Sequence, residues 1–293
     1  MPFMEENAEE LRADFAMICD TVMFESRTPA ITTMLRGLLG EELTITAPSK
    51  DLHSGMFGGI AINPIRVLSR VIAALHDDQG RVTIPGFYDG VPELSDELEA
   101  QWQGLAFDHE AFLGDVGLSV PAGEQDRTPL EMIWSRPTCE VNGIGGGYQG
   151  DGFKTVLPSE ASAKISFRLV GDQDPLAIRA SFRKMVEDML PADCTVAWKG
   201  HGASRASGVA TDDPAFARAL KALSDEWQVP AAYIGSGGSI PIAGHFQKIL
   251  DTPPVLIGFS KDDDQIHSPN EKYDMESFHK GIRSWARILD ALT

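Results

Sequence analysis

The stretch ASAKISFRLV at residues 161–170 alternates apolar and polar side chains along most of its length. This period of two is typical of a strand that buries one face against a core. The sequence then predicts an amphipathic helix over residues 175–190 and a further strand at 194–199. These elements predict half of an antiparallel sheet that carries helices on one side.

A similar set of elements lies upstream of this stretch. Residues 41–47 alternate in the manner of a strand, and NPIRVLSRVIAAL at 63–75 places its apolar residues on one helical face. Residues 139–143 form another strand-like run. Across 41–199 the order is strand, helix, strand, strand, helix, strand, which is typical of a ferredoxin-like α+β domain.

Two other features of this region lack a regular pattern. Residues 78–137 are rich in glycine, proline and acidic residues, and they predict a long excursion of loops and short helices. Gly37 and Gly40 stand between the strand-like runs at 29–36 and 41–47, where we expect them to punctuate the chain. The chain is therefore expected to change domain near Gly37.

The flanking segments predict a different architecture. DFAMICD at residues 14–20 is a short apolar run that ends in an acid, as a buried strand would. Beyond Ser207, the pattern alternates between helices and strands, which predicts a mainly parallel sheet covered by helices. We therefore expect an α/β domain of residues 1–36 and 208–293, interrupted by an inserted α+β domain of residues 37–207.

Composition excludes several classes of function. The 293-residue chain has a formal net charge of −18, which disfavours nucleic acid and anionic membrane surfaces as partners. It has no apolar run near the roughly 20 residues of a spanning helix and no export signal at its N-terminus, so a cytoplasmic protein is expected. Three widely separated cysteines fit reduced thiols. Any bound metal must therefore rely on histidines and carboxylates.

Three residues are candidates for chemistry, and each also has a plain structural explanation. His267 follows an apolar strand at 255–258, where a neutral imidazole could bind zinc, but it could equally be a loop histidine on an acidic surface. Asp20 ends the strand at 14–20 and could simply cap the next turn. His53 lies in the glycine-rich segment DLHSGMFGG, where a loop histidine often has no function.

The glycine-rich turn GSGGSIP at residues 235–241 could present backbone N–H groups to an anion. The sequence contains neither GxxxxGK[ST] nor GxGxxG, so phosphate and dinucleotide ligands have little support. A carboxylate is the preferred guest. A second glycine-rich run, residues 143–158, is explained by a hairpin-like turn without a ligand.

Several segments in a consistent order together resemble one family. They are CDT at 19–21, DLHSGMFGG at 51–59, GYQGDGFKTVLP at 147–158, SFRLVGDQDP at 166–175, GGSIP at 237–241 and DDDQIHSPNEKYD at 262–274. They are similar to segments of the carnosinase-like dipeptidases of the acetylornithine deacetylase and succinyl-diaminopimelate desuccinylase superfamily. The resemblance spans nearly the whole chain.

The resemblance implies a catalytic domain with two zinc ions, interrupted by a smaller lid or dimerisation domain. Asp20 would be a ligand of one zinc and His267 a ligand of the other. His53 would reach the active site of a partner subunit and stabilise the oxyanion of the tetrahedral intermediate. Thr155 would approach that site from the same partner, so the resemblance also implies a homodimer formed through the lid.

The same resemblance implies a site for the terminal carboxylate of the substrate. Arg168 would bind it, assisted by Ser239 and the backbone of Gly237 and Gly238. His201 would also contact substrate. Two departures weaken parts of this pattern, because Ala203 replaces a glycine near His201 and Ser236 stands where many relatives have glutamate.

The largest departure concerns the metal ligands. Relatives carry, upstream of the segments found here, a His-x-Asp segment and a Glu-Glu pair that supply further ligands and the general base. Glu5 and Glu6 lie in a segment that follows that pair in relatives, so they are not expected to replace it. We therefore expect the C-terminal portion of a two-zinc hydrolase, with an incomplete catalytic sheet.

The expected substrates are dipeptides or N-acyl amino acids. The expected metal is zinc, although His and carboxylate ligands would also suit manganese or cobalt. This chain alone is predicted to bind zinc weakly and to hydrolyse nothing. The alternative is a non-catalytic fragment for dimerisation and substrate recognition.

Overall fold

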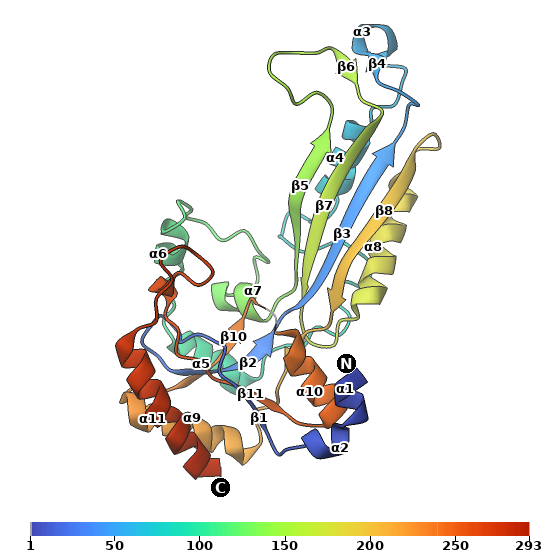
Figure 1. Cartoon of the computed structure of the whole chain (residues 1–293). Coiled ribbons are helices and arrows are strands. Elements are labelled where there is room, and N and C mark those ends of the chain that lie inside the picture. The colour runs from blue at the N-terminus through green and yellow to red at the C-terminus, as the bar shows by residue number, and fades with distance from the viewer. Residues whose placement is uncertain (1, 239, 293) are drawn as a thin grey trace.

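The computed structural model describes residues 2–238 and 240–292 (Figure 1). An elongated lid domain rises from a body in which helices surround a sheet, and both chain termini lie in the body. The body contains α1 (Pro2–Glu6), α2 (Ala8–Leu11), β1 (Ala16–Ile18), β2 (Ala30–Leu35), β9 (Ser207–Gly208), α9 (Pro214–Trp227), β10 (Ala232–Ser236), α10 (Pro241–Leu250), β11 (Pro254–Leu256), the 3₁₀ turn η1 (Asp262–Asp264) and α11 (Met275–Leu292).

The lid is an antiparallel sheet with two helices. Its elements are β3 (Gly37–Thr46), α4 (Pro64–Ala73), β5 (Thr138–Gly146), β7 (Glu160–Leu169), α8 (Pro175–Met189) and β8 (Thr195–Ser204), and a small hairpin-like pair, β4 (Leu52–His53) and β6 (Val156–Leu157), stands at its tip beside α3 (Ser54–Phe57). The strand order β5-β7-β3-β8, with every pairing antiparallel, confirms the predicted ferredoxin-like arrangement.

One face of the lid sheet forms the core. Side chains along β3 and β7 alternate between buried and partly exposed, as the period of two requires. The buried side chains, among them Leu43 and Phe167, pack with Phe182 of α8 and Leu68 of α4. The opposite face is left uncovered by these helices and carries polar side chains.

Gly40 does not punctuate the chain as predicted, because it lies inside β3, whereas Gly37 begins that strand where the chain leaves the body sheet. A Cβ atom on Gly37 would lie 2.5 Å from the carbonyl oxygen of Ser204, and one on Gly40 would lie 2.9 Å from Cβ of His201. The glycines therefore permit close approach of β8. The chain passes between the two sheets at Arg36, which joins β2 to β3.

The body sheet is mixed. Strand β1 is parallel to β11 and β2 is parallel to β10, but β11 meets β2 in antiparallel fashion at Leu256 and Thr32. The expectation of a mainly parallel sheet therefore holds for two pairings. Strand β2 follows β1 through residues 19–29 with no crossover helix, and a connection without such a crossover favours a reversal of direction.

The long excursion returns to the body. Its short helices are α5 (Asp96–Gly104), α6 (His109–Gly114) and α7 (Pro129–Trp134). Trp102 and Trp134 pack edge to face, and the indole N–H of Trp102 donates to the carbonyl oxygen of Tyr233 at 3.0 Å. Part of the segment expected in the lid, residues 96–134, thus covers the body sheet.

None of the helices in the described ranges is long and apolar enough to cross a membrane.

A buried ion pair fastens α8 to the lid sheet, and its removal should be costly. Glu41 is fully buried and accepts from Arg179 at 2.6 Å and from Arg183 at 2.7 Å. We predict that Glu41→Ala lowers the free energy of unfolding, measured by urea titration, by about 3 kcal/mol. The substitution leaves two partly buried arginines without their carboxylate partner. Glu42→Ala, on the open face, should cost under about 1 kcal/mol in the same urea titration. Equal losses would contradict this account.

Candidate metal and substrate site

The two candidate metal ligands lie on neighbouring loops of the body. Asp20 follows β1 and His267 lies in the loop after β11, and these two strands are parallel neighbours. Beyond the strands the contact continues, because the N–H of Met23 donates to the carbonyl oxygen of Ser260 at 2.9 Å. Both loops therefore leave the same edge of the sheet, which is where ligands gather in α/β folds.

The loop that carries His267 is tied together by a buried carboxylate. Asp264 is 1% exposed, accepts from Nζ of Lys272 at 2.7 Å and accepts from the N–H of Lys261 at 2.8 Å. Burial opposes ionisation of Asp264, but these two hydrogen bonds outweigh it and lower its pKa. His267 itself is exposed and has a φ of 62°, so its conformation depends on the loop that Asp264 closes.

A second contact joins the loops. The Ser26 hydroxyl accepts from the N–H of Asp262 at 2.9 Å and donates to its carboxylate at 3.1 Å. The carboxylate of Asp20 and the imidazole of His267 suit zinc in kind. Within residues 2–238 and 240–292, however, no three His, Cys, Asp or Glu side chains form a group that could hold a metal ion.

The open face of the lid sheet carries Arg168 and His201. Arg168 on β7 is partly exposed, and no hydrogen bond or ion pair joins it to another of the described residues. His201 on β8 is exposed and lies 3.4 Å from a carboxylate oxygen of Glu42. Because Arg168 pairs with Leu38 and His201 pairs with Gly40, both side chains lie on the same face of the lid sheet. Both pairs lie near the hinge, which is the junction at Arg36 between β2 of the body and β3 of the lid.

The glycine turn lies beside that hinge. The N–H of Arg36 donates to the carbonyl oxygen of Gly238 at 3.1 Å, and the N–H of Gly238 donates to the Ser236 hydroxyl at 3.1 Å. Gly237 follows β10 directly. Ser239, predicted to assist Arg168, lies outside the described residues.

Sequence reasoning missed Arg36. It is 7% exposed, and its buried Nε has no hydrogen-bond partner in the described structure. A cation in MLRG, at the end of a strand and directly before a glycine, was the only signal for it.

His53 ends β4 and Thr155 directly precedes β6, and these two strands stand at the tip of the lid, far from β1 and β11 of the body (Figure 1). The N–H of Ser54 donates to the carbonyl oxygen of Thr155 at 3.1 Å, and Nδ1 of His53 accepts from the N–H of Gly55 at 3.0 Å. Strand β3 has 10 residues from the hinge toward the tip. At about 3.3 Å per residue it spans about 33 Å, so His53 is remote from the metal loops of its own chain.

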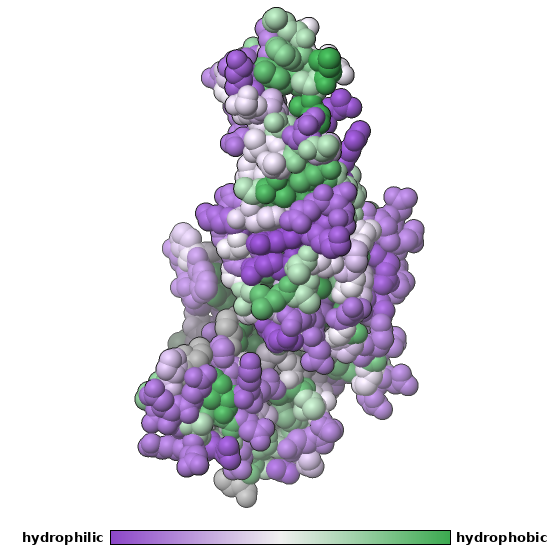
Figure 2. All heavy atoms as spheres, turned by 90° about the vertical axis from the view of Figure 1, so that its right-hand side faces the viewer, coloured by the Kyte–Doolittle hydropathy of each residue, from purple (hydrophilic) through white to green (hydrophobic). Residues whose placement is uncertain are grey.

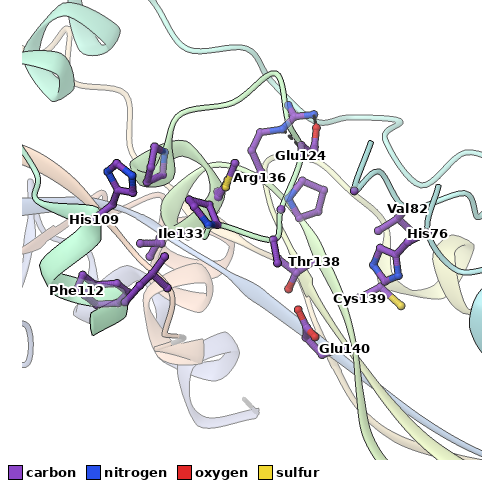
Figure 3. A pocket seen from close by; sticks show the side chains of 18 of the residues that line it. His76, Val82, His109, Phe112, Glu124, Ile133, Arg136, Thr138, Cys139 and Glu140 are labelled. Atoms are coloured by element: carbon purple, nitrogen blue, oxygen red, sulfur yellow. Dashed lines mark hydrogen bonds and ion pairs between the residues drawn. The ribbon is translucent and has the colours of Figure 1, made fainter. Parts of the chain in front are cut away.

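Two cavities lie near the candidate site, and a third, of about 620 Å³, is bordered by Arg36. One, of about 600 Å³, lies beside the metal loops and is bordered by Glu25, Asp262 and Gly235–Gly237. The other, of about 270 Å³, lies between β5 and the excursion, where Thr138 and Glu140 face it from β5 and Phe112 from α6 (Figure 3). Its buried Arg136 is bound by both oxygens of Glu124, at 3.1 and 2.9 Å. That pair is internally satisfied and leaves little charge for a ligand.

Gly258 sets how closely the two metal loops approach. A Cβ atom there would lie 1.8 Å from the carbonyl oxygen of Thr21, so we predict that Gly258→Ala pushes the loops apart and costs about 1–3 kcal/mol of unfolding free energy. Gly104→Ala, at the end of α5 where a Cβ meets nothing within 4 Å, is the control and should be neutral or slightly stabilising in urea denaturation. If both variants changed the free energy of unfolding equally little, the close packing of Gly258 against Thr21 would be contradicted.

Comparison with known proteins places this architecture in one family. Residues 33–194 match the peptidase dimerisation domain of the M20 family. The chain is 30% identical over 284 residues to a Cys-Gly metallodipeptidase of Candida albicans, covering 93% of this chain and 57% of that protein. It is 28% identical to the human Beta-Ala-His dipeptidase over 93% of this chain and 54% of the relative.

A solved structure agrees with these relatives. The M20 family metallo-carboxypeptidase Sso-CP2 from Sulfolobus solfataricus is 27% identical and superposes with a TM-score of 0.85, covering 99% of this chain and 66% of that one. The chain thus spans a little over half the length of the curated relatives described above. The fold, the dimerisation domain and the relatives agree, and the chain belongs to the M20 family of peptidases.

Proposed function

We propose that these residues serve a metal-dependent hydrolase that cleaves the amide bond of dipeptides or N-acyl amino acids. The observation that carries this proposal is the pair of adjoining loops that hold Asp20 and His267 at one edge of the body sheet. The relatives named as a Cys-Gly metallodipeptidase and a Beta-Ala-His dipeptidase support it. Asp20 and His267 would be ligands of two different zinc ions.

Zinc, when bound, would supply Lewis-acid activation of water and of the scissile carbonyl. The residues of this chain would bind and orient the substrate. Arg168 offers the terminal carboxylate a guanidinium that no other described residue pairs with, and His201 lies on the same face of the lid. Gly237, Gly238 and Ser239 would complete this end of the site beside the hinge.

His53 and Thr155 would act on a partner subunit in a homodimer formed through the lid. Their separation from the metal loops of their own chain supports this assignment, as does the match to a dimerisation domain. The tip around them exposes apolar side chains, including Met56 at 74%, Ile60 at 85% and Phe153 at 92%, and Figure 2 shows apolar surface at that end. Exposed apolar clusters of this kind favour burial against another protein.

The domain assignment and location complete the proposal. Residues 1–36 and 208–293 would form the catalytic domain, and residues 37–207 would form the inserted lid segment, part of which covers the body sheet. The net charge of −18 supports a small-molecule substrate over nucleic acid or an anionic membrane. The protein would be cytoplasmic.

A second candidate function is a non-catalytic module for dimerisation and substrate recognition. It is favoured by the finding that the described residues contain no group of three metal donors. The same finding underlies our proposal that this 293-residue chain alone holds zinc weakly and does not turn over substrate.

Zinc binding tests the assignment. In equilibrium dialysis with elemental analysis, we expect fewer than two tightly bound zinc ions per chain, with the affinity lowered about tenfold or more by Asp20→Asn and by His267→Gln. His279→Gln, which changes an exposed histidine on α11, should leave zinc binding unchanged. We expect no hydrolysis of Cys-Gly or β-Ala-His by this chain.

The outcomes separate the candidates. Zinc binding that is insensitive to both variants would contradict the ligand assignment, and two tightly held zinc ions or robust turnover would overturn the predicted inactivity. A discrete dimer that binds no zinc would favour the recognition module. A His-x-Asp segment and a Glu-Glu pair in the coding DNA upstream of Met1 would support the hydrolase.

A further inference from the structure

Arg36 and Arg168 are two cations near the junction between the body and the lid. Arg168 pairs with Leu38 on the open face of the lid sheet, and Arg36 lies two residues before Leu38, in the single-residue link between β2 and β3. Electrostatics agree, because burial and the nearby positive charge of Arg168 lower the pKa of Arg36 to about 10, with Glu140 opposing the shift.

Among the described residues, no carboxylate forms an ion pair with either arginine. The guanidinium of Arg36 donates from Nη2 to the carbonyl oxygen of Met132, while its buried Nε has no partner in the described structure. Arg168 has no hydrogen bond or ion pair with any of the described residues. Glu140 acts on Arg36 only through space, since no ion pair joins it to either arginine within the described part of the chain.

Such an arrangement is unfavourable without a ligand. A buried guanidinium normally gains compensating hydrogen bonds from a carboxylate, and a like charge beside it raises the energy of the charged form. A bound carboxylate would satisfy Arg168 and stabilise the charged form of Arg36. Two guanidinium groups at one site favour a planar, doubly hydrogen-bonding anion.

The main chain of Arg36 also reaches the second part of this site. Its N–H donates to the carbonyl oxygen of Gly238, which fixes the glycine turn to the strand that leads into the lid. One residue therefore touches the turn through its backbone, while the charge of its side chain is influenced by Arg168. Movement of the hinge would shift both parts together.

We propose that Arg36 is the positioning residue of a two-arginine carboxylate site, in which Arg168 contacts the carboxylate and Arg36 supplies a buried second charge and anchors the glycine turn. This inference rests on the proposed function for the identity of the ligand as a substrate carboxylate. It does not require zinc, so it can be tested separately.

The test is an NMR titration of the 293-residue chain with N-acetylglycine in the absence of zinc, with the neutral N-acetylglycinamide as the control ligand. We expect binding of the acid only, loss of that binding in Arg168→Met, and a dissociation constant raised about tenfold in Arg36→Met. Arg36→Lys should restore most of the affinity, because it keeps the charge. Arg66→Met, on the exposed side of α4, is the matched control and should bind like the parent chain.

The pH profile distinguishes a charge from a purely structural role and needs no variant that might misfold. Affinity should fall as the pH rises through about 10, where Arg36 loses its proton, and this fall should be absent from Arg36→Met. The charged groups that influence the pKa of Arg36 are Arg168 and Glu140. Arg36 also borders a cavity of about 620 Å³, which is lined by the titratable or charged side chains Asp174, Arg205, His245 and Lys248. Comparison of the two profiles subtracts the contribution of those groups.

Unchanged affinity in Arg36→Met, or a flat profile in the parent chain, would overturn the proposal. Equal binding of the acid and the amide, or no binding of the acid, would overturn it as well. If carboxylate binding depends on Arg36 while zinc binding ignores Asp20 and His267, the hydrolase assignment fails and the two-arginine site stands.

Discussion

The rest of the structure depends on the passage of one chain segment from the centre of one sheet to the centre of the other. Strand β2 pairs with β10, β11 and β9 in the body, and after Arg36 alone the chain continues as β3, which is flanked by β7 and β8 in the lid. The lid is thereby joined to the body through hydrogen-bonded strands. Gly37 makes this possible, because any side chain there would collide with the backbone of Ser204–Ala206.

This junction explains how the candidate site is divided. The glycine turn borders the same cavity as the metal loops, and Arg168 lies near the end of β7 that adjoins the body. His53 and Thr155 are carried away by the length of β3. A rigid sheet cannot fold back on itself, so the tip can serve a second copy of the chain far more readily than its own. The apolar side chains at the tip fit that arrangement.

Much of the fold follows from local patterns in the sequence. The period of two in β7 and the amphipathic character of α4 and α8 specify the lid, and the helices predicted beyond Ser207 include α9 and α11. The direction of β2 against β11 was not predictable from alternation, because it depends on the loop between β1 and β2. The punctuating role expected for Gly40 was wrong, since close approach of a neighbouring strand leaves no trace in a single sequence.

The candidate site was only partly predictable for the same reason. Asp20 and His267 each follow a strand, so their shared edge could be expected, and the structure carries both on adjoining loops. Arg36 could not be identified, because its importance comes from a neighbour more than 100 positions away in the sequence. Likewise, Trp102 and Trp134 look like members of the lid segment until their contacts with the body sheet are known.

The central claim is that the functional site is shared between two copies of the chain, and a cross-link tests it directly. Cys19, next to Asp20, is exposed, whereas Cys139 and Cys194 are buried. Burial raises the pKa of all three thiols, that of Cys139 to about 12, so accessibility selects Cys19 for the reagent. In a Thr155→Cys variant, a short bismaleimide should join the tip of one chain to Cys19 of the other and give a covalent dimer that Cys19→Ser abolishes. Cross-linked monomer, or dimer that persists without Cys19, would contradict the claim.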